Sequence, residues 1–165
     1  MQDTDKRFQK AVKVVLAHEG GYADVAGDSG GETNFGISKK SYPRLDIKML
    51  TVEHATAIYY RDYWRLYGYG RLQKTSVATK VFDLAVNMGA AKAHLCLQRA
   101  LKRAGKRIKL DGILGQQTIS LANKMDEEML LAGLRMEAAA HYRRIIAANP
   151  ILKKFEQGWM RRANY

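Results

Sequence analysis

The sequence predicts a mainly α-helical fold, a helical bundle with a small irregular or hairpin lobe after the first helix. Apolar residues recur at helical spacing along most of the 165 residues, and most of these stretches end close to a glycine. The chain has only two prolines and no repeat, low-complexity tract or Pro/Ser-rich linker. The exception is the glycine-rich stretch 22–36, which has no helical period. A chain of this length can bury a core as one compact unit.

The first helix is predicted from the apolar stripe formed by Phe8, Ala11, Val12, Val15 and Leu16. A cap among residues 3–5 fits its start, and Gly20-Gly21 fits its end. Further helical patterns run over about 51–66, 76–88, 91–104, a short stretch from 116, 126–148, and a last short helix after Asn149-Pro150. We expect a lobe of residues 1–90 with a basic helical region, residues 91–165, packed against it without a flexible linker.

Positive charge is concentrated in the C-terminal half of the chain. The net charge is +12; residues 1–89 carry 13 Lys or Arg against 10 Asp or Glu, whereas residues 90–165 carry 15 against 6. Such a surface concentrates near polyanions, which include nucleic acid, anionic lipid, and an acidic cell wall or outer-membrane surface. The sequence contains no nucleic-acid-binding motif that we can place, so we expect no nucleic-acid partner.

The cysteine, the histidines and the apolar runs indicate which kinds of site and segment the protein lacks. The single cysteine, Cys96, lies in an apolar stretch and is predicted to be a small buried side chain that forms no disulfide. The four histidines have neither metal-ligand spacing nor a nucleophile partner, so no metal and no cofactor is expected. No apolar run reaches the length of a signal-peptide core or a membrane span. We expect a monomer made in the cytoplasm without a signal peptide.

Glu19 is the candidate catalytic acid. Positions 8, 12, 15 and 19 are spaced four, three and four residues apart, which places Glu19 on the apolar face of the first helix. Partial burial and the carbonyl groups at the helix end both favour the protonated form of its carboxyl group. A general acid needs that proton near neutral pH. The alternative is a glutamate at a frayed helix end, turned into water.

Two strings of residues surround this glutamate. The first is His18-Glu19-Gly20-Gly21-Tyr22, and the second is Asp28-Ser29-Gly30-Gly31-Glu32-Thr33-Asn34-Phe35-Gly36-Ile37. With these strings the chain resembles glycoside hydrolase family 108, and the likeness continues through residues 57–64 and 83–89. Residues 91–165 resemble the helical peptidoglycan-binding region that usually follows in this family.

The resemblance implies an α+β lysozyme-like fold in which residues 1–90 form the catalytic lobe. It implies an N-acetylmuramidase, or lysozyme, of the kind found in phage endolysins and bacterial wall enzymes, with Glu19 as the catalytic residue. Its substrate would be the glycan strands of peptidoglycan, cleaved at the β-1,4 bond between N-acetylmuramic acid and N-acetylglucosamine during bacterial cell lysis. Two alternatives remain, a lytic transglycosylase and a non-catalytic cell-wall-binding module.

An enzyme of this kind would act in the periplasm or cell wall after release by a holin-type or secretion machine. Its basic C-terminal half would also contact anionic outer-membrane or wall polymers, an attraction that salt weakens.

Hydrolysis needs a second carboxylate, for which Asp28 is the first candidate and Glu32 the second. Asp28 also fits an ordinary turn, in which an aspartate caps backbone amides. A separation of roughly 6.5–9.5 Å between the two carboxyl groups means inversion and about 5–5.5 Å means retention, so the stereochemistry stays open. The spacing is also similar to that of phage-type lysozymes, where the third position is typically threonine. Here Thr33 comes one residue early and Asn34 occupies the place.

The predicted substrate-contacting residues are Tyr22, Gly31, Thr33, Asn34, Tyr60, Trp64 and Asn87. Gly31 permits positive φ and a close approach to a sugar, and hydroxyl or amide groups can hold water or a substrate hydroxyl. Among the crowded aromatics, helical spacing assigns Tyr59, Tyr63 and Leu66 to the core and Tyr60, Trp64 and Tyr67 to the cleft. Asn87 can bind an N-acetyl group or hydroxyl, whereas Asp83, one turn earlier, more simply ties its helix to the first lobe.

Overall fold

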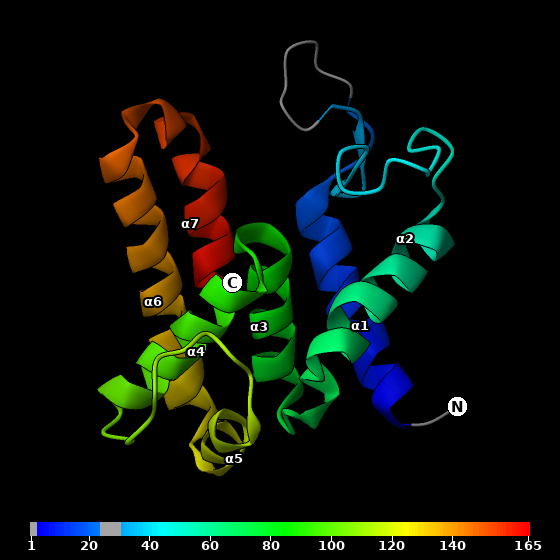
Figure 1. Ribbon diagram of the computed structural model, residues 1–165. Coiled ribbons are helices and arrows are strands. Elements are labelled where there is room, and N and C mark those ends of the chain that lie inside the picture. The colour runs from blue at the N-terminus through cyan, green and yellow to red at the C-terminus, as the bar shows by residue number, and fades with distance from the viewer. Residues whose placement is uncertain (1–2, 24–30) are drawn as a thin grey trace.

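The computed structural model describes residues 3–23 and 31–165, and in them the chain is mainly helical, as the sequence predicts (Figure 1). The α-helices are α1 (Asp3–Glu19), α2 (Val52–Tyr59), α3 (Thr75–Met88), α4 (Ala90–Arg103), α5 (Gln116–Lys124), α6 (Glu127–Ala148) and α7 (Glu156–Asn164). The shorter helical segments are the π-helix η1 (Tyr60–Arg65) and the 3-10 helices η2 (Tyr69–Arg71) and η3 (Pro150–Phe155). The strands β1 (Thr33–Asn34) and β2 (Ile37–Ser38) form an antiparallel hairpin.

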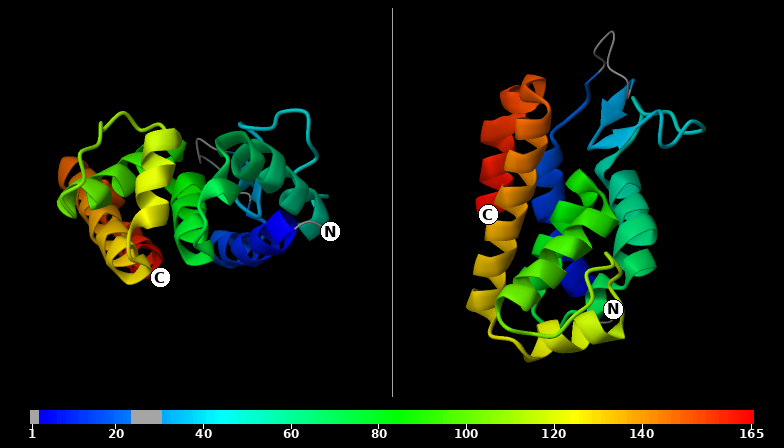
Figure 2. Two further views of the ribbon diagram at one scale, coloured as in Figure 1. Left: turned by 90° about the horizontal axis from the view of Figure 1, so that it is seen from below. Right: turned by 60° about the vertical axis from the view of Figure 1, so that its left-hand side comes forward.

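Helix α3 lies at the centre of the molecule. Its residues 77–85 are all buried, which is typical of a helix that is surrounded by protein. Figure 1 and the left-hand view of Figure 2 show α1 and α2 on one side of α3 and α6 and α7 on the other. Because α3 contacts α1, α4 and α6, one continuous core joins the two sides.

Helix α1 confirms the predicted stripe and stop. Phe8, Val12 and Val15 are at most 3% exposed and face the core. Gly20 has φ +73°, the left-handed conformation that commonly ends a helix and that glycine adopts without strain. The helix therefore delivers Glu19, its last residue, to the point where the chain turns into the hairpin lobe.

The hairpin lobe folds back toward the end of α1. Ala23 and Thr33 exchange two backbone hydrogen bonds of 2.8 Å, which tie the chain after α1 to the start of the hairpin. The two turn residues, Phe35 and Gly36, both have positive φ, at 51° and 75°, as tight two-residue hairpin turns favour. This turn points back toward Glu19.

The aromatic segment after α2 differs from the sequence-based assignment. Trp64 is only 2% exposed, whereas Leu66 is 66% exposed, so the predicted cleft residue lies in the core and the predicted core residue faces solvent. Residues 60–65 form a π-helix, whose wider turn changes the angle between successive side chains. A face assigned with 3.6 residues per turn is therefore wrong at Trp64 and Leu66, whereas Tyr63 packs against the core as predicted.

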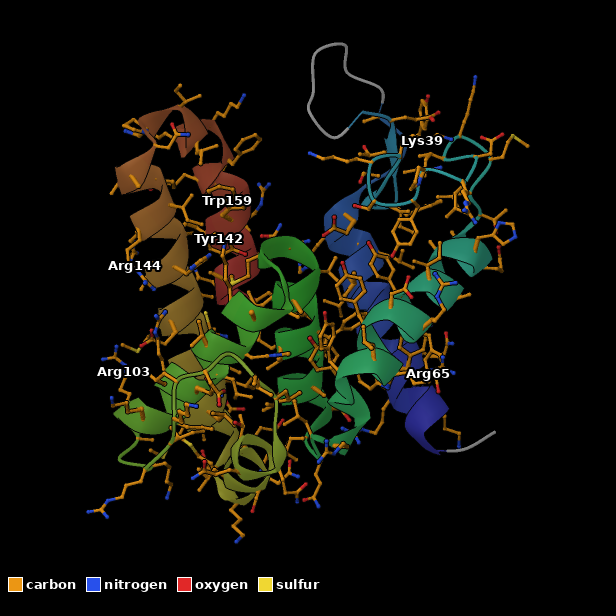
Figure 3. All side chains as sticks on the ribbon, in the orientation of Figure 1. Lys39, Arg65, Arg103, Tyr142, Arg144 and Trp159 are labelled. Atoms are coloured by element: carbon orange, nitrogen blue, oxygen red, sulfur yellow. The ribbon has the colours of Figure 1, made fainter. Side chains whose placement is uncertain are left out.

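Helices α6 and α7 form a hairpin that returns the chain to α1. Asn149 follows α6, and its side chain accepts a hydrogen bond from the backbone N–H of Ile151 at 3.3 Å. Tyr142 on α6 and Trp159 on α7 stack with ring centroids 5.1 Å apart and an angle of 18° between the rings; Figure 3 labels both. This contact fixes the position of α7, so the end of the chain lies beside Glu19.

In the described part of the chain, no helix has the length and apolar character needed to span a membrane. Cys96 is buried on α4, as predicted, and burial raises the pKa of its thiol to about 11.

Candidate active site

The carboxyl group of Glu19 lies between two segments that are distant in sequence. Its side chain is 16% exposed, so it is mostly enclosed but still open to solvent. The hairpin turn contacts it from one side and α7 from the other. Glu19 is thus not a glutamate at a frayed helix end.

The hairpin backbone packs directly on this carboxyl group at Gly36. A Cβ atom on Gly36 would lie 2.4 Å from Oε2 of Glu19 and 2.7 Å from the hydroxyl oxygen of Tyr59, which is closer than real Cβ contacts. Glycine is therefore required by space as well as by its positive φ. In the sequence, Gly36 is only one residue of the second string, and no local pattern predicts its contact with Glu19.

Tyr59 holds the hairpin turn in place. Its hydroxyl group donates a 2.7 Å hydrogen bond to the backbone carbonyl of Phe35. Burial, together with the negative charge of Glu19, raises the pKa of Tyr59, so the phenol remains protonated and keeps this bond. Tyr59 is a core residue, as predicted, and it also positions the wall of the site.

Arg162 on α7 is the second group that contacts Glu19. Its Nη2 atom lies 2.6 Å from Oε1 of Glu19, and the arginine side chain is only 7% exposed. The two residues are 143 positions apart. In the sequence, Arg161-Arg162 reads as one of several basic pairs on a solvated helix, and no local pattern distinguishes Arg162 from the others.

Asp83 and His18 extend this cluster behind Glu19. Asp83 is fully buried on α3, and its Oδ1 atom lies 2.9 Å from Nδ1 of His18 and 3.4 Å from Nε of Arg162. The Oδ2 atom of Asp83 is buried and has no hydrogen-bond partner among the described residues. Asp83 thus ties α3 to α1, the role the sequence suggests, and also to α7.

The structure describes only one of the two candidates for the second carboxylate. Asp28 lies outside the described residues. Glu32 is partly exposed at the start of the hairpin, where its Oε1 atom accepts a 3.0 Å hydrogen bond from the hydroxyl group of Tyr22. Gly31 has φ +65°, and among the described residues no atom lies within 4 Å of the position that a Cβ atom would take there.

Thr33 and Asn34 make contacts within the protein. The hydroxyl group of Thr33 donates to the carbonyl of Ala23 at 3.4 Å. Asn34 is 5% exposed, and its Nδ2 atom donates to the carbonyl of Ile47 at 3.1 Å. The Asn34 amide therefore secures the loop after the hairpin and does not point to a ligand, in contrast to the sequence-based expectation.

Tyr60 and Trp64 lie away from Glu19. Tyr60 packs edge-on against Phe8, with ring centroids 5.0 Å apart, and lines a groove of about 670 Å³ between α1 and α2. Phe8 precedes Glu19 by eleven residues on the same helix, roughly 16 Å at 1.5 Å per residue. Trp64 packs against Phe82 in the core at 5.6 Å. The structure does not bring either aromatic ring to Glu19.

Asn87 lies at a cavity on the other side of Arg162. The cavity has a volume of about 280 Å³, and its walls include His18, Asn87, Trp159 and Arg162. The Oδ1 atom of Asn87 accepts a 2.8 Å hydrogen bond from the hydroxyl group of Tyr142, which leaves the exposed amide nitrogen to donate elsewhere. This cavity and the Glu19 carboxyl group share Arg162 as a wall.

Within residues 3–23 and 31–165, no group of three or more His, Cys, Asp or Glu side chains is arranged to hold a metal ion. The candidate site consists of a partly enclosed carboxyl group, a glycine turn packed on it, and an arginine from α7. A helical bundle with a small hairpin lobe is consistent with a lysozyme-like fold, and a carboxyl group of this kind is what a glycoside hydrolase needs.

Comparison with known proteins gives the family. The model of the glycosyl hydrolase 108 family matches residues 12–89, and the model described as a predicted peptidoglycan domain matches residues 92–164. Residues 12–89 of the chain are thus a glycosyl hydrolase 108 domain. The two matches together make the protein a peptidoglycan hydrolase, with peptidoglycan as its partner.

A solved structure extends this relationship over nearly the whole chain. The chain is similar to SagA of Brucella abortus, with 28% sequence identity and a TM-score of 0.77, over 96% of this chain and 90% of that one. No curated protein matches the chain closely enough to count as a relative.

Proposed function

We propose that the protein is an N-acetylmuramidase that cleaves the β-1,4 bond between N-acetylmuramic acid and N-acetylglucosamine, with Glu19 as the general acid, in bacterial cell lysis. The observation that carries this proposal is the carboxyl group of Glu19, 16% exposed and enclosed by the Gly36 backbone and Arg162. A carboxyl group in such surroundings can give a proton to the departing glycosidic oxygen while most bulk water is kept away.

The second carboxylate is Asp28 or Glu32. Both follow Glu19 in the sequence, and either one can activate water or attack the sugar. The 3.0 Å hydrogen bond from the hydroxyl group of Tyr22 fixes the orientation of the Glu32 carboxyl group. Asp28→Asn and Glu32→Gln proteins, assayed side by side, would show which carboxylate carries the reaction.

The glycan also contacts the end of α3, beside α6. Asn87 offers an amide N–H to a carbonyl group, and the N-acetyl group of either sugar supplies such a carbonyl. The exposed cations of α6, α7 and η3 attract anionic wall and outer-membrane polymers, which increases the local concentration of enzyme at its substrate. The protein would act on peptidoglycan in the periplasm or cell wall.

The test is the release of reducing ends from purified peptidoglycan by the parental protein and by Glu19→Gln. We expect Glu19→Gln to lose about 10²–10⁴-fold in rate while it still sediments with peptidoglycan. Glu128→Gln, an exposed glutamate on α6, is the matched control and should keep the parental rate. Parental lysis by Glu19→Gln would overturn the proposal.

Mass spectrometry of the products separates the alternative functions. Reducing muramic acid ends indicate a muramidase, and anhydro-muramyl ends indicate a lytic transglycosylase. Binding without any new ends from the parental protein would indicate a wall-binding module.

A further inference from the structure

Arg162 occupies the side of the Glu19 carboxyl group that Gly36 does not cover. Gly36 packs against Oε2, and Nη2 of Arg162 lies 2.6 Å from Oε1. A glycosidic oxygen that receives a proton from Glu19 must come within hydrogen-bonding distance of one of these two oxygens. Arg162 therefore has to give up this contact before a glycosidic oxygen can reach Oε1.

Asp83 offers Arg162 another acceptor. Nε of Arg162 already lies 3.4 Å from Oδ1 of Asp83, and the neighbouring Oδ2 atom is buried without a hydrogen-bond partner among the described residues. An unpaired buried carboxylate oxygen is costly, and a guanidinium group can bind both oxygens of a carboxylate at once. Asp83 thus has a free acceptor beside the arginine that must move.

The backbone of Arg162 is held while its side chain can change partner. Lys80, which is 1% exposed on α3, donates a hydrogen bond from Nζ to the backbone carbonyl of Arg162. Burial lowers the pKa of Lys80 to about 8. The exchange from Glu19 to Asp83 then needs only a side-chain movement, which is fast compared with catalysis.

The charged and titratable groups around this exchange come from several elements. They are His18 on α1, Tyr59 on α2, Tyr63 on η1, Lys80 and Asp83 on α3, Tyr142 on α6 and Arg162 on α7. Burial raises the pKa of the three tyrosines, so they stay neutral in the working range of the enzyme. Arg162 and Asp83 are therefore the groups that can exchange partners beside Glu19.

We infer that Arg162 and Asp83 are positioning residues for the reaction: Arg162 pairs with Glu19 in the free enzyme and with both oxygens of Asp83 when a glycan strand occupies the site. This inference rests on the proposed role of Glu19. The incoming glycosidic oxygen displaces Arg162, and Glu19 takes up one proton from solvent and later gives it to that oxygen. A ligand shifts such an equilibrium because only one of the two arrangements leaves room for it.

The experiment measures the pH dependence of reducing-end release from peptidoglycan. The activity lost on the alkaline side reports the deprotonation of the acid. Asp83→Asn replaces the charged acceptor with a neutral amide, which binds a guanidinium group more weakly, so this alkaline limb should move to lower pH. Arg162→Gln removes the cation that pairs with Glu19, so the limb should move to higher pH.

The double variant shows whether Asp83 acts through Arg162. In the Arg162→Gln background, Asp83→Asn should no longer shift the limb, because the group through which it acts is absent. A shift of equal size in both backgrounds would overturn the inference, since Asp83 would then act on Glu19 directly. A purely structural role would lower the rate without moving the limb. Arg143→Gln and Asp46→Asn, two exposed residues, are the matched controls.

Two further outcomes keep the test decisive. If Asp83→Asn does not fold, Arg162→Gln alone is sufficient, and an unmoved limb in that protein contradicts the inference. A parental protein that releases no reducing ends, or a Glu19→Gln protein that releases them normally, refutes the proposed function instead. The inference fails if the parental enzyme is active but neither substitution shifts the alkaline limb.

Discussion

The two sides of α3 contribute to the site in different ways. On the side of α1 and the hairpin, the acid and the turn that covers it lie within 18 residues of each other, from Glu19 to Gly36. On the side of α6 and α7, one arginine reaches the same carboxyl group from 143 residues away. The segment matched as a predicted peptidoglycan domain thus also contributes a wall of the candidate site.

Substitution of Trp64 is expected to have the largest effect. It tests the packing on the first side of α3, the side that carries α1, α2 and the hairpin. Trp64→Ala removes a large side chain that is 2% exposed, so we expect a loss of about 3–5 kcal/mol in the free energy of unfolding. Tyr60→Ala should cost less than half as much, because Tyr60 is partly exposed. Urea unfolding measures both. Equal losses would mean that Trp64 is not the core residue.

Gly36→Ala tests the local contact at the acid. A Cβ atom 2.4 Å from Oε2 of Glu19 must displace the turn or the carboxyl group, and displacements of about 1 Å reduce rates by about 100-fold. We expect a loss of that size in reducing-end release. Gly115→Ala is the control, because a Cβ atom there meets nothing within 4 Å. Full activity in Gly36→Ala would show that the turn does not contact the acid.

Lys80 tests the junction between α3 and α7 through pH. The pKa of Lys80 is about 8 in the folded protein, below its ordinary value of 10.5, so the unfolded chain binds more protons between these values. The stability of the parental protein relative to Lys80→Met should therefore rise with pH from 8 to 10.5, by roughly 1–3 kcal/mol. Chemical unfolding at several pH values measures this difference. A constant difference over that range would contradict the burial of Lys80.

Substitution of Asn87 tests whether the substrate reaches the second side of α3, the side that carries α6 and α7. Asn87→Ala removes the exposed amide donor and the acceptor for Tyr142, and we expect KM for soluble glycan fragments to rise about 5- to 10-fold with little change in kcat. Gln73→Ala, another exposed amide, is the control. An unchanged KM would confine the substrate to the first side.

The comparison also explains what could be predicted from the sequence. Helix boundaries follow local rules, so the stop at Gly20 and the helix that begins after Asp126 agree with the structure. Glu19 was found because it continues the apolar stripe of one helix. The faces of Trp64 and Leu66 were misassigned because nothing local reveals a π-helix.

Arg162 could not be found in this way. Its role depends on the return of α7 to α1, a long-range contact that no helical period encodes. Asn34 shows the converse: its sequence position suggested a ligand contact, but tertiary structure uses its amide to hold the backbone at Ile47.

The most direct test of the two-sided site is a double-mutant cycle between Glu19 and Arg162, measured as free energies of unfolding. Glu19→Gln, Arg162→Gln and the double variant are unfolded in urea at neutral pH. We expect a coupling energy of about 1–3 kcal/mol, because the two groups form a charge-assisted hydrogen bond with side chains that are only 16% and 7% exposed. Additive effects, within about 0.5 kcal/mol, would contradict the contact that joins the two sides.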